Sequence, residues 1–173
     1  MKASEIGSIN CGVAQTLSVI GDRWTMMILR NAFYGMKSFE AFQDHLGIST
    51  SVLSDRLNRL IQDGVLVKEA SVHDRRSTVY RLTEKGIDLY PVMVALKGWG
   101  EKHHPNPKGK RLILVEKTTG TPIQGAAVLT EDGRAVSARD VTPLPGPAID
   151  PDLKPLVEGR AQQIQETLEQ ENE

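Results

Sequence analysis

The chain has 173 residues, of which 39% are hydrophobic and 25% are charged, and its formal net charge is −1. This composition is typical of a soluble globular protein with one or two domains. The apolar runs are too short to span a bilayer, and residues 1–10 lack the apolar segment of a secretory signal. We therefore expect a cytoplasmic protein with no membrane partner.

Cys11 is the only cysteine, which excludes an intrachain disulfide and any zinc site made of several cysteines. The four histidines, His45, His73, His103 and His104, match no standard ligand spacing. We expect neither a metal nor another cofactor. Residues 1–104 contain 13 Lys and Arg against 11 Asp and Glu, so a nucleic-acid surface would have to be local.

The first predicted elements are helices that end at glycines. Cys11–Ile20 places Val13, Leu17 and Ile20 on one face before Gly21. Asp22 can cap the next helix, whose apolar stripe is Trp24, Met27, Ile28 and Ala32 or Phe33. Ser38 can cap a short third helix that ends at Gly47. A fourth helix follows the step Gly47-Ile48-Ser49, has the stripe Leu53, Leu57, Leu60 and Ile61, and ends at Gly64.

Two short helices joined by a tight step that contains glycine are typical of a helix-turn-helix. Two β-like runs, Val65–Ala70 and Thr78–Leu82, follow around the charged tip 73–77 and predict a wing hairpin. Thr83 can cap a further helix. Its inward side chains are expected to be Ile87, Tyr90, either Met93 or Val94, and Leu96. Pro91 predicts a break in this helix. For Trp24 and Trp99 we favour core or interface positions over the lining of a ligand pocket.

The last third has a different pattern. We predict strands at 111–116, 123–130 and 134–141, a turn at 118–122, and a two-residue hairpin turn at Asp132-Gly133. A proline-rich linker precedes a helix with the stripe Leu156, Ala161, Ile164 and Leu168, which either packs on a second subunit or frays. The predicted fold is α+β, with a winged helix-turn-helix domain for DNA binding and dimerisation at 1–104, a small C-terminal β-hairpin appendage at 105–147, and a linker with a terminal helix at 148–173.

The run from Cys11 to His103 resembles the HxlR family of winged-helix regulators, which are relatives of the MarR group. The resemblance rests on an ordered series of short motifs: Thr16-Leu17, Ile20-Gly21, Arg23-Trp24-Thr25, Ile28-Leu29-Arg30, Gly47-Ile48-Ser49, Val52-Leu53-Ser54, Asp63-Gly64, Leu82-Thr83, Pro91-Val92 and Trp99-Gly100-Glu101. It implies a homodimer on double-stranded DNA that responds to oxidants, electrophiles or other small-molecule effectors. Gly12 follows Cys11 where the family usually has proline.

The polar side of the fourth helix is the predicted DNA surface. As readers of base edges we select Thr50, Ser51, Ser54 and Asn58. As contacts to phosphates we select Ser49, Arg56, Arg59, Lys37, and the wing residues Arg75 and Arg76, with Arg23 as a further candidate. The alternative for Arg56 and Arg59 is that they solvate an amphipathic helix.

Cys11 is a candidate redox sensor, because a thiolate near a helix start is favoured by the helix dipole. The alternative is a small buried hydrophobic residue. The sequence predicts a DNA-binding regulator, acting as a repressor on an inverted-repeat operator. An enzyme with Cys11 as nucleophile lacks recognisable partner residues. A second alternative is a regulator whose C-terminal appendage binds a partner protein.

Overall fold

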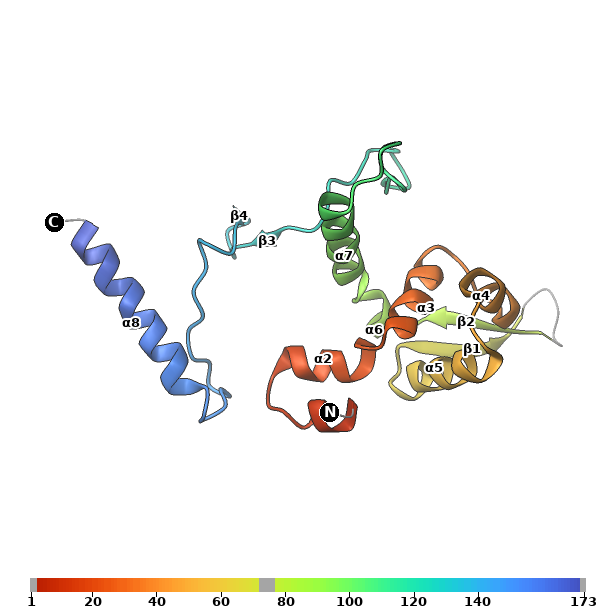
Figure 1. Ribbon diagram of the computed structural model, residues 1–173, viewed down its shortest axis with the longest axis horizontal. Helices are drawn as coiled ribbons and strands as arrows, with labels where there is room; N and C mark the ends of the chain where they lie inside the picture. The colour runs from red at the N-terminus through yellow and green to blue at the C-terminus, as the bar shows by residue number, and fades with distance from the viewer. Residues whose placement is uncertain (1–2, 72–76, 172–173) are drawn as a thin grey trace.

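The computed structural model describes residues 3–71 and 77–171. Figure 1 shows a helical domain with a two-stranded hairpin, followed by an extended segment that leads away from it to a terminal helix. We call residues 105–171 the C-terminal arm. This arrangement confirms the predicted winged helix-turn-helix with a hairpin appendage and a terminal helix. The domain boundaries at residues 104 and 147 stay predictions.

The domain contains helices α1 (Ala3–Gly7), α2 (Gly12–Ile20), α3 (Arg23–Phe33), α4 (Phe39–Leu46), α5 (Thr50–Gln62), α6 (Glu84–Ile87) and α7 (Tyr90–His103), with strands β1 (Leu66–Ala70) and β2 (Thr78–Leu82). The C-terminal arm contains strands β3 (Val128–Leu129) and β4 (Ala135–Val136) and helix α8 (Lys154–Glu171). Helix α1 was not predicted, because five residues are too few to display a helical period.

The predicted capping residues begin three helices. The Asp22 carboxylate accepts hydrogen bonds from the backbone N–H groups of Trp24 and Thr25, at 3.0 and 3.1 Å. Ser38 accepts from the N–H of Ala41 and Thr83 from that of Gly86, both at 3.1 Å. Each side chain satisfies a donor that the first turn of a helix leaves without an intrahelical partner.

The hydrophobic core joins α3, α4, α5 and the wing. Its fully buried side chains include Ile28, Leu29, Phe42, Leu53, Leu57, Leu60, Val65 and Leu66. Strands β1 and β2 pair antiparallel from Leu66 opposite Leu82 to Ala70 opposite Thr78. The wing is tied to the loop before α4 by a hydrogen bond of 2.7 Å from the Tyr80 N–H to the Lys37 carbonyl. The tip, with His73, Arg75 and Arg76, lies outside the described residues.

Several side chains on the predicted apolar helix faces are exposed. On α2, Ile20 is buried, but Val13 and Leu17 are 69% and 47% exposed. Around α7, Val94 is buried, whereas Ile87 and Leu96 are exposed. Trp24 packs against the core as expected, whereas Trp99 is 61% exposed in the single chain, so only an interface position stays a prediction for it. The domain of one chain offers these side chains no second layer to pack against.

The break predicted near Pro91 is present between α6 and α7. Pro91 lies in the first turn of α7, where a missing N–H has no intrahelical acceptor to lose. Within the described residues, no helix has the length and apolar character needed to cross a membrane.

The C-terminal arm has less strand than predicted. Residues 111–116 and 123–127 form no strand, apart from one isolated bridge between Val115 and Pro122. The hairpin at Asp132-Gly133 exists, but its loop holds three residues, 131–133, because Thr130 donates to the Arg134 carbonyl at 2.9 Å. Gly133 has φ of 84°, a left-handed conformation that closes this longer loop. Strands that face water on both sides have little apolar burial to extend them.

Candidate nucleic-acid interface

The step between α4 and α5 is as short as predicted. Gly47 has φ of 62°, a left-handed conformation that ends α4. Ser49 is the N-cap of α5, and its side chain accepts from the Val52 N–H at 3.4 Å. Ile48 is buried between them. The two helices are therefore held in fixed relation, as a helix-turn-helix requires.

Helix α5 has one buried and one exposed face. Leu53, Leu57 and Leu60 are buried in the core. The opposite face presents Thr50, Ser51, Asn58 and Arg59 to solvent, with Ser54 half-buried at its edge. Four of the five side chains are small and polar, so a nucleic-acid backbone or base edge can approach α5 closely.

The start of α5 carries three exposed hydroxyl groups, and one of them is held by a neighbouring helix. The Oγ atoms of Ser49 and Ser51 lie 3.2 Å apart. Thr50 Oγ1 accepts from Gln43 Nε2 of α4 at 2.9 Å. Gln43 was missed in the sequence, although its position seven residues before Thr50, across the turn, is the signal that could have revealed it. The described geometry adds Gln43 to the candidate surface.

The remaining cations are not all on α5. Arg59 pairs with Asp55 one turn earlier, at 3.2 Å, and both side chains are about half exposed. Arg23 is exposed, and its guanidinium lies 5.8 Å from the centre of the Trp24 ring. Lys37 is exposed in the loop that is tied to the wing through Tyr80.

Arg56, predicted to contact a phosphate, is instead paired with carboxylates of its own chain. Its Nε donates to Asp22 Oδ1 at 2.7 Å and its Nη2 to Asp22 Oδ2 at 3.3 Å, while Nη1 pairs with Asp55. All three guanidinium nitrogens are engaged by carboxylates. Because this two-point contact joins α5 to the start of α3, Arg56 leaves our set of phosphate contacts and becomes a link between the two helices.

The electrostatics of this link are mutually reinforcing. Partial burial disfavours the charged form of Asp22, but hydrogen bonds from Arg56 and from the backbone of Thr25 and Trp24 outweigh it and lower the pKa of the carboxyl below its usual 3.8. The hydrogen bond to Asp22 in turn raises the pKa of Arg56. Both groups are charged at neutral pH, so the link is an ion pair as well as a helix cap.

We expect Asp22→Ala to lower the free energy of unfolding by about 2 kcal/mol, because it removes the α3 cap and the partner of Arg56 together. Asp22→Asn keeps the cap and should cost about half as much. Urea denaturation followed by circular dichroism measures both. Folding lowers the pKa of Asp22. The stability that its charged form contributes is therefore complete above pH 3.8 and is lost as the pH falls through the pKa of Asp22 in the folded protein. Equal stability of all three proteins at pH 7 would contradict this role.

Cys11 is the N-cap residue of α2 and is half-buried, and its side chain makes no capping hydrogen bond. Both the sensor role and the alternative of a small buried residue therefore stay predictions. The thiol stands at the start of the helix that carries the exposed Val13 and Leu17.

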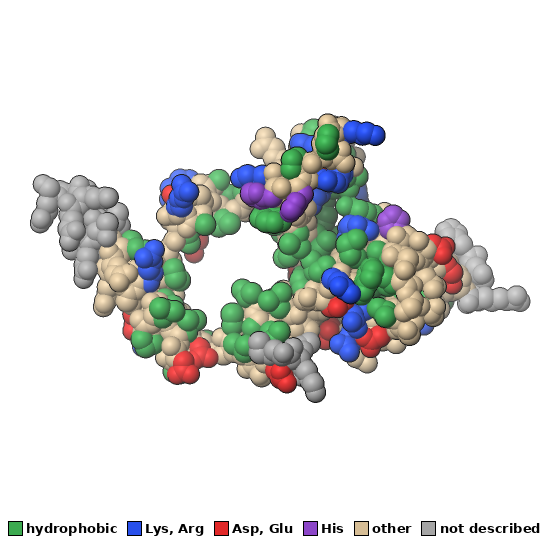
Figure 2. Space-filling view, viewed as in Figure 1, with side chains coloured by type: hydrophobic (Ala, Val, Ile, Leu, Met, Phe, Trp, Pro, Cys, Tyr) green, Lys and Arg blue, Asp and Glu red, His purple; other side chains and the backbone are tan. Residues whose placement is uncertain are grey.

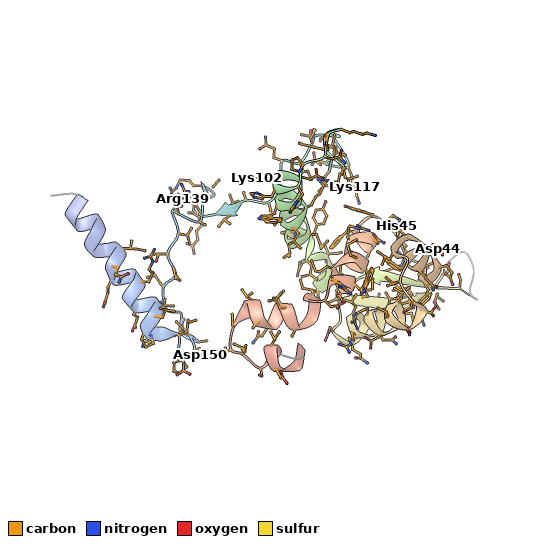
Figure 3. The ribbon with its side chains drawn as sticks, viewed as in Figure 1. Asp44, His45, Lys102, Lys117, Arg139 and Asp150 are labelled. Carbon is orange, nitrogen blue, oxygen red and sulfur yellow. The ribbon has the colours of Figure 1, made fainter. Side chains whose placement is uncertain are left out.

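His45 lies on α4, whereas His103 and His104 follow one another at the end of α7. Figure 3 labels His45 beside α4, well apart from Lys102, which precedes His103 on α7. Among residues 3–71 and 77–171, no group of three His, Cys, Asp or Glu side chains is arranged to hold a metal ion.

Comparison with known proteins agrees with this geometry. The HxlR-like helix-turn-helix model matches residues 19–108. The HTH-type transcriptional regulator Mb3122 of Mycobacterium bovis is 38% identical over 135 residues, which are 78% of this chain and 85% of that protein.

Two solved structures extend the comparison. That of PA1607, described as a candidate transcription factor, has a TM-score of 0.75 at 36% identity and covers 82% of this chain and 99% of its own. The oxidised form of the redox regulator HypR has a TM-score of 0.50 at 32% identity, over 56% of this chain and 100% of its own. Because the matches to Mb3122 and PA1607 cover 78% and 82% of this chain, which is more than residues 1–104 can supply, they include part of the C-terminal arm. The chain belongs to the HxlR-like helix-turn-helix family of transcription regulators.

Proposed function

We propose that the protein represses transcription as a homodimer whose two α5 helices enter successive major grooves of an inverted-repeat operator. The observation that carries this proposal is the division of α5 into a leucine face, buried in the core, and a small polar face, open to solvent. Thr50, Ser51, Ser54 and Asn58 read base edges, with Ser49, Gln43 and Arg59 near the backbone. Lys37, Arg23 and the wing tip, with Arg75 and Arg76, add phosphate contacts.

The exposed apolar faces support dimerisation. Val13 and Leu17 on α2 and Leu96 and Trp99 on α7 are water-exposed in the single chain. Figure 2 shows hydrophobic side chains of the domain and of the C-terminal arm around a central opening. Asn10 closes this ring by donating to the Ala148 carbonyl at 3.0 Å. A second copy that fills the opening would bury a surface that monomers rarely expose.

Selection of bound sequences from a random DNA pool tests the proposal. A two-fold dimer should recover inverted repeats whose half-site centres are about one helical turn, ~34 Å, or a multiple of it apart. Binding should weaken steeply as salt rises, because phosphate contacts release counterions. Recovery of no common sequence, with binding insensitive to salt, would refute DNA recognition by this surface.

We expect Asn58→Ala to change base preference more than overall affinity. Asn58 is exposed and forms no side-chain hydrogen bond within the described structure, so its amide is available to a base edge. The selected operator should lose about 1–3 kcal/mol of discrimination at one position in each half-site, while binding to random DNA stays the same. A gel-shift series with single-base operator variants measures this. A uniform loss on every sequence would instead identify Asn58 as a backbone contact.

A second candidate property is a thiol signal at Cys11. The half-buried thiol precedes the helix whose exposed face we assign to the dimer, and the similar protein HypR is named a redox regulator. Oxidation of Cys11 would add polar atoms next to the interface and alter the spacing of the two α5 helices.

We expect hydrogen peroxide, which converts the thiol to a sulfenic acid and is itself reduced to water, to lower the operator affinity of the wild-type protein by about tenfold, a usual size for coupling between two sites. Dithiothreitol should restore the affinity. Cys11→Ser should bind the operator normally and ignore the oxidant. Fluorescence anisotropy with labelled operator measures both. An unchanged response in Cys11→Ser would remove the sensor role.

The alternative that the C-terminal arm binds a partner protein is tested separately. Leu144 and Leu156 of the arm are both 71% exposed. Our proposal expects a chain ended after His104 to dimerise and bind DNA more weakly. Unchanged dimerisation and operator affinity would instead favour a partner protein for the arm.

A further inference from the structure

A cavity of about 420 Å³ lies between α3 and α7. Its wall on α3 includes Met26, Met27 and Phe33, and its wall on α7 includes Tyr90 and Met93. The rings of Phe33 and Tyr90 touch across the two helices, with their centres 5.1 Å apart. The volume is in the range of small-molecule sites, and three methionines can adapt to ligands of different shape.

The cavity and the proposed dimer face adjoin on α7, because Leu96 belongs to both. Tyr90, Met93, Lys97 and Glu101 line the cavity, and they recur at spacings of three and four residues. Trp99 does not line the cavity and lies on the exposed side of α7. A second subunit that packs on Trp99 therefore borders the cavity at Leu96 and leaves the space between Phe33 and Met93 to another occupant.

Charge around the cavity is positive. Arg30 donates from Nε and Nη2 to Asn31 Oδ1, at 3.0 and 2.7 Å, so its charge meets a neutral amide. Lys97 has no ion-pair partner among the described residues. Arg111 is balanced by Glu101 at 3.4 Å. Arg30 and Lys97 are therefore two cations without a carboxylate partner beside an apolar wall, and an anion would complement them.

We propose that this cavity binds a hydrophobic carboxylate, with its apolar body between α3 and α7 and its carboxylate at Lys97 and Arg30, and that binding changes operator affinity. The second clause rests on the proposed function. Helix α3 is joined to α5 through Asp22 and Arg56, whereas α7 carries the proposed dimer face. A ligand that separates α3 from α7 moves the reading helix relative to the two-fold axis.

Calorimetric titration of the full-length protein without DNA tests the site alone. The probes are decanoate and 4-phenylbutanoate, with decanol and 4-phenylbutanol as neutral analogues. At least one acid should saturate at one molecule per subunit and bind about tenfold tighter than its alcohol, since a charge-assisted contact is worth that much. Equal binding of acid and alcohol, or no saturable binding of either acid, overturns the proposal.

Two lysine variants locate the carboxylate. Lys97→Gln should weaken the acid about tenfold and leave the alcohol unchanged. Lys108→Gln, in the exposed loop after α7, removes the same charge outside the cavity and should alter neither. If Lys97→Gln binds the acid as tightly as the wild type does, the placement of the carboxylate at Lys97 is wrong. If this variant does not fold, the wild-type comparison of acid with alcohol still decides the ligand class.

Operator binding with and without the acid that binds then tests regulation. A change of at least about fivefold in operator affinity is expected. If the protein binds its operator normally and the ligand does not change that affinity, the ligand site stands but its role in regulation does not. Failure to bind any operator, with calorimetric binding intact, contradicts the proposed function and not the site.

Discussion

Ser51→Glu should reduce operator affinity about 100-fold or more while leaving the fold intact. Ser51 is exposed in the first turn of α5, within the surface that we assign to the major groove. A carboxylate there repels phosphates and, unlike the serine hydroxyl, cannot donate a hydrogen bond to an acceptor on the DNA. A dimer carries the defect in both half-sites, at a cost of about 1–3 kcal/mol each before repulsion is added. Gel-shift titration at fixed salt measures the loss.

This substitution separates recognition from stability. Glutamate in the first turn of a helix is favoured by the helix dipole, so the melting temperature should stay the same or rise slightly. Gln162→Glu adds the same charge to the exposed surface of α8 and should leave operator affinity unchanged. Full operator binding by Ser51→Glu would exclude the start of α5 from the interface.

Trp99→Glu should convert the dimer to a monomer at micromolar concentration. Trp99 is 61% exposed on α7, and a large aromatic side chain that is exposed in the monomer and buried at an interface is a frequent hot spot. Two buried carboxylates beside the two-fold axis should raise the dissociation constant of the dimer about 100-fold or more. Sedimentation velocity measures the association, and operator affinity should fall with it.

The control for Trp99→Glu is Ile113→Glu. Ile113 is 59% exposed, almost as much as Trp99, but it lies on neither α2 nor α7, the two helices that carry the proposed dimer face. Its substitution should leave the dimer intact. A dimer that survives Trp99→Glu, or dissociates equally in both variants, would show that α7 is not the main contact.

The helix-turn-helix could be predicted from sequence because its signals are local. Asp22, Ser38 and Thr83 cap helices through bonds to backbone groups two or three residues away. Gly47 ends α4 because it adopts a left-handed conformation without a side-chain clash. Capping and chain reversal depend on neighbours in sequence, so no tertiary information is needed to find them.

The errors arose where a residue's environment is set by distant parts of the chain. Arg56 and Arg59 look alike on a helical wheel, but only Arg56 is within reach of Asp22, which lies 34 positions earlier. Val13, Leu17 and Trp99 have the spacing of core residues, yet the single chain provides nothing to cover them. The strands of the C-terminal arm failed to extend for the same reason.

The amino-acid sequence by itself determines the order of the helices, the position of the turn and the polar side of α5, because helical period and capping act over a few residues. Tertiary structure decided the partner of Arg56, the exposure of the α2 and α7 faces, and the cavity between α3 and α7. These features depend on the distance between segments far apart in the chain, which packing of the whole domain sets.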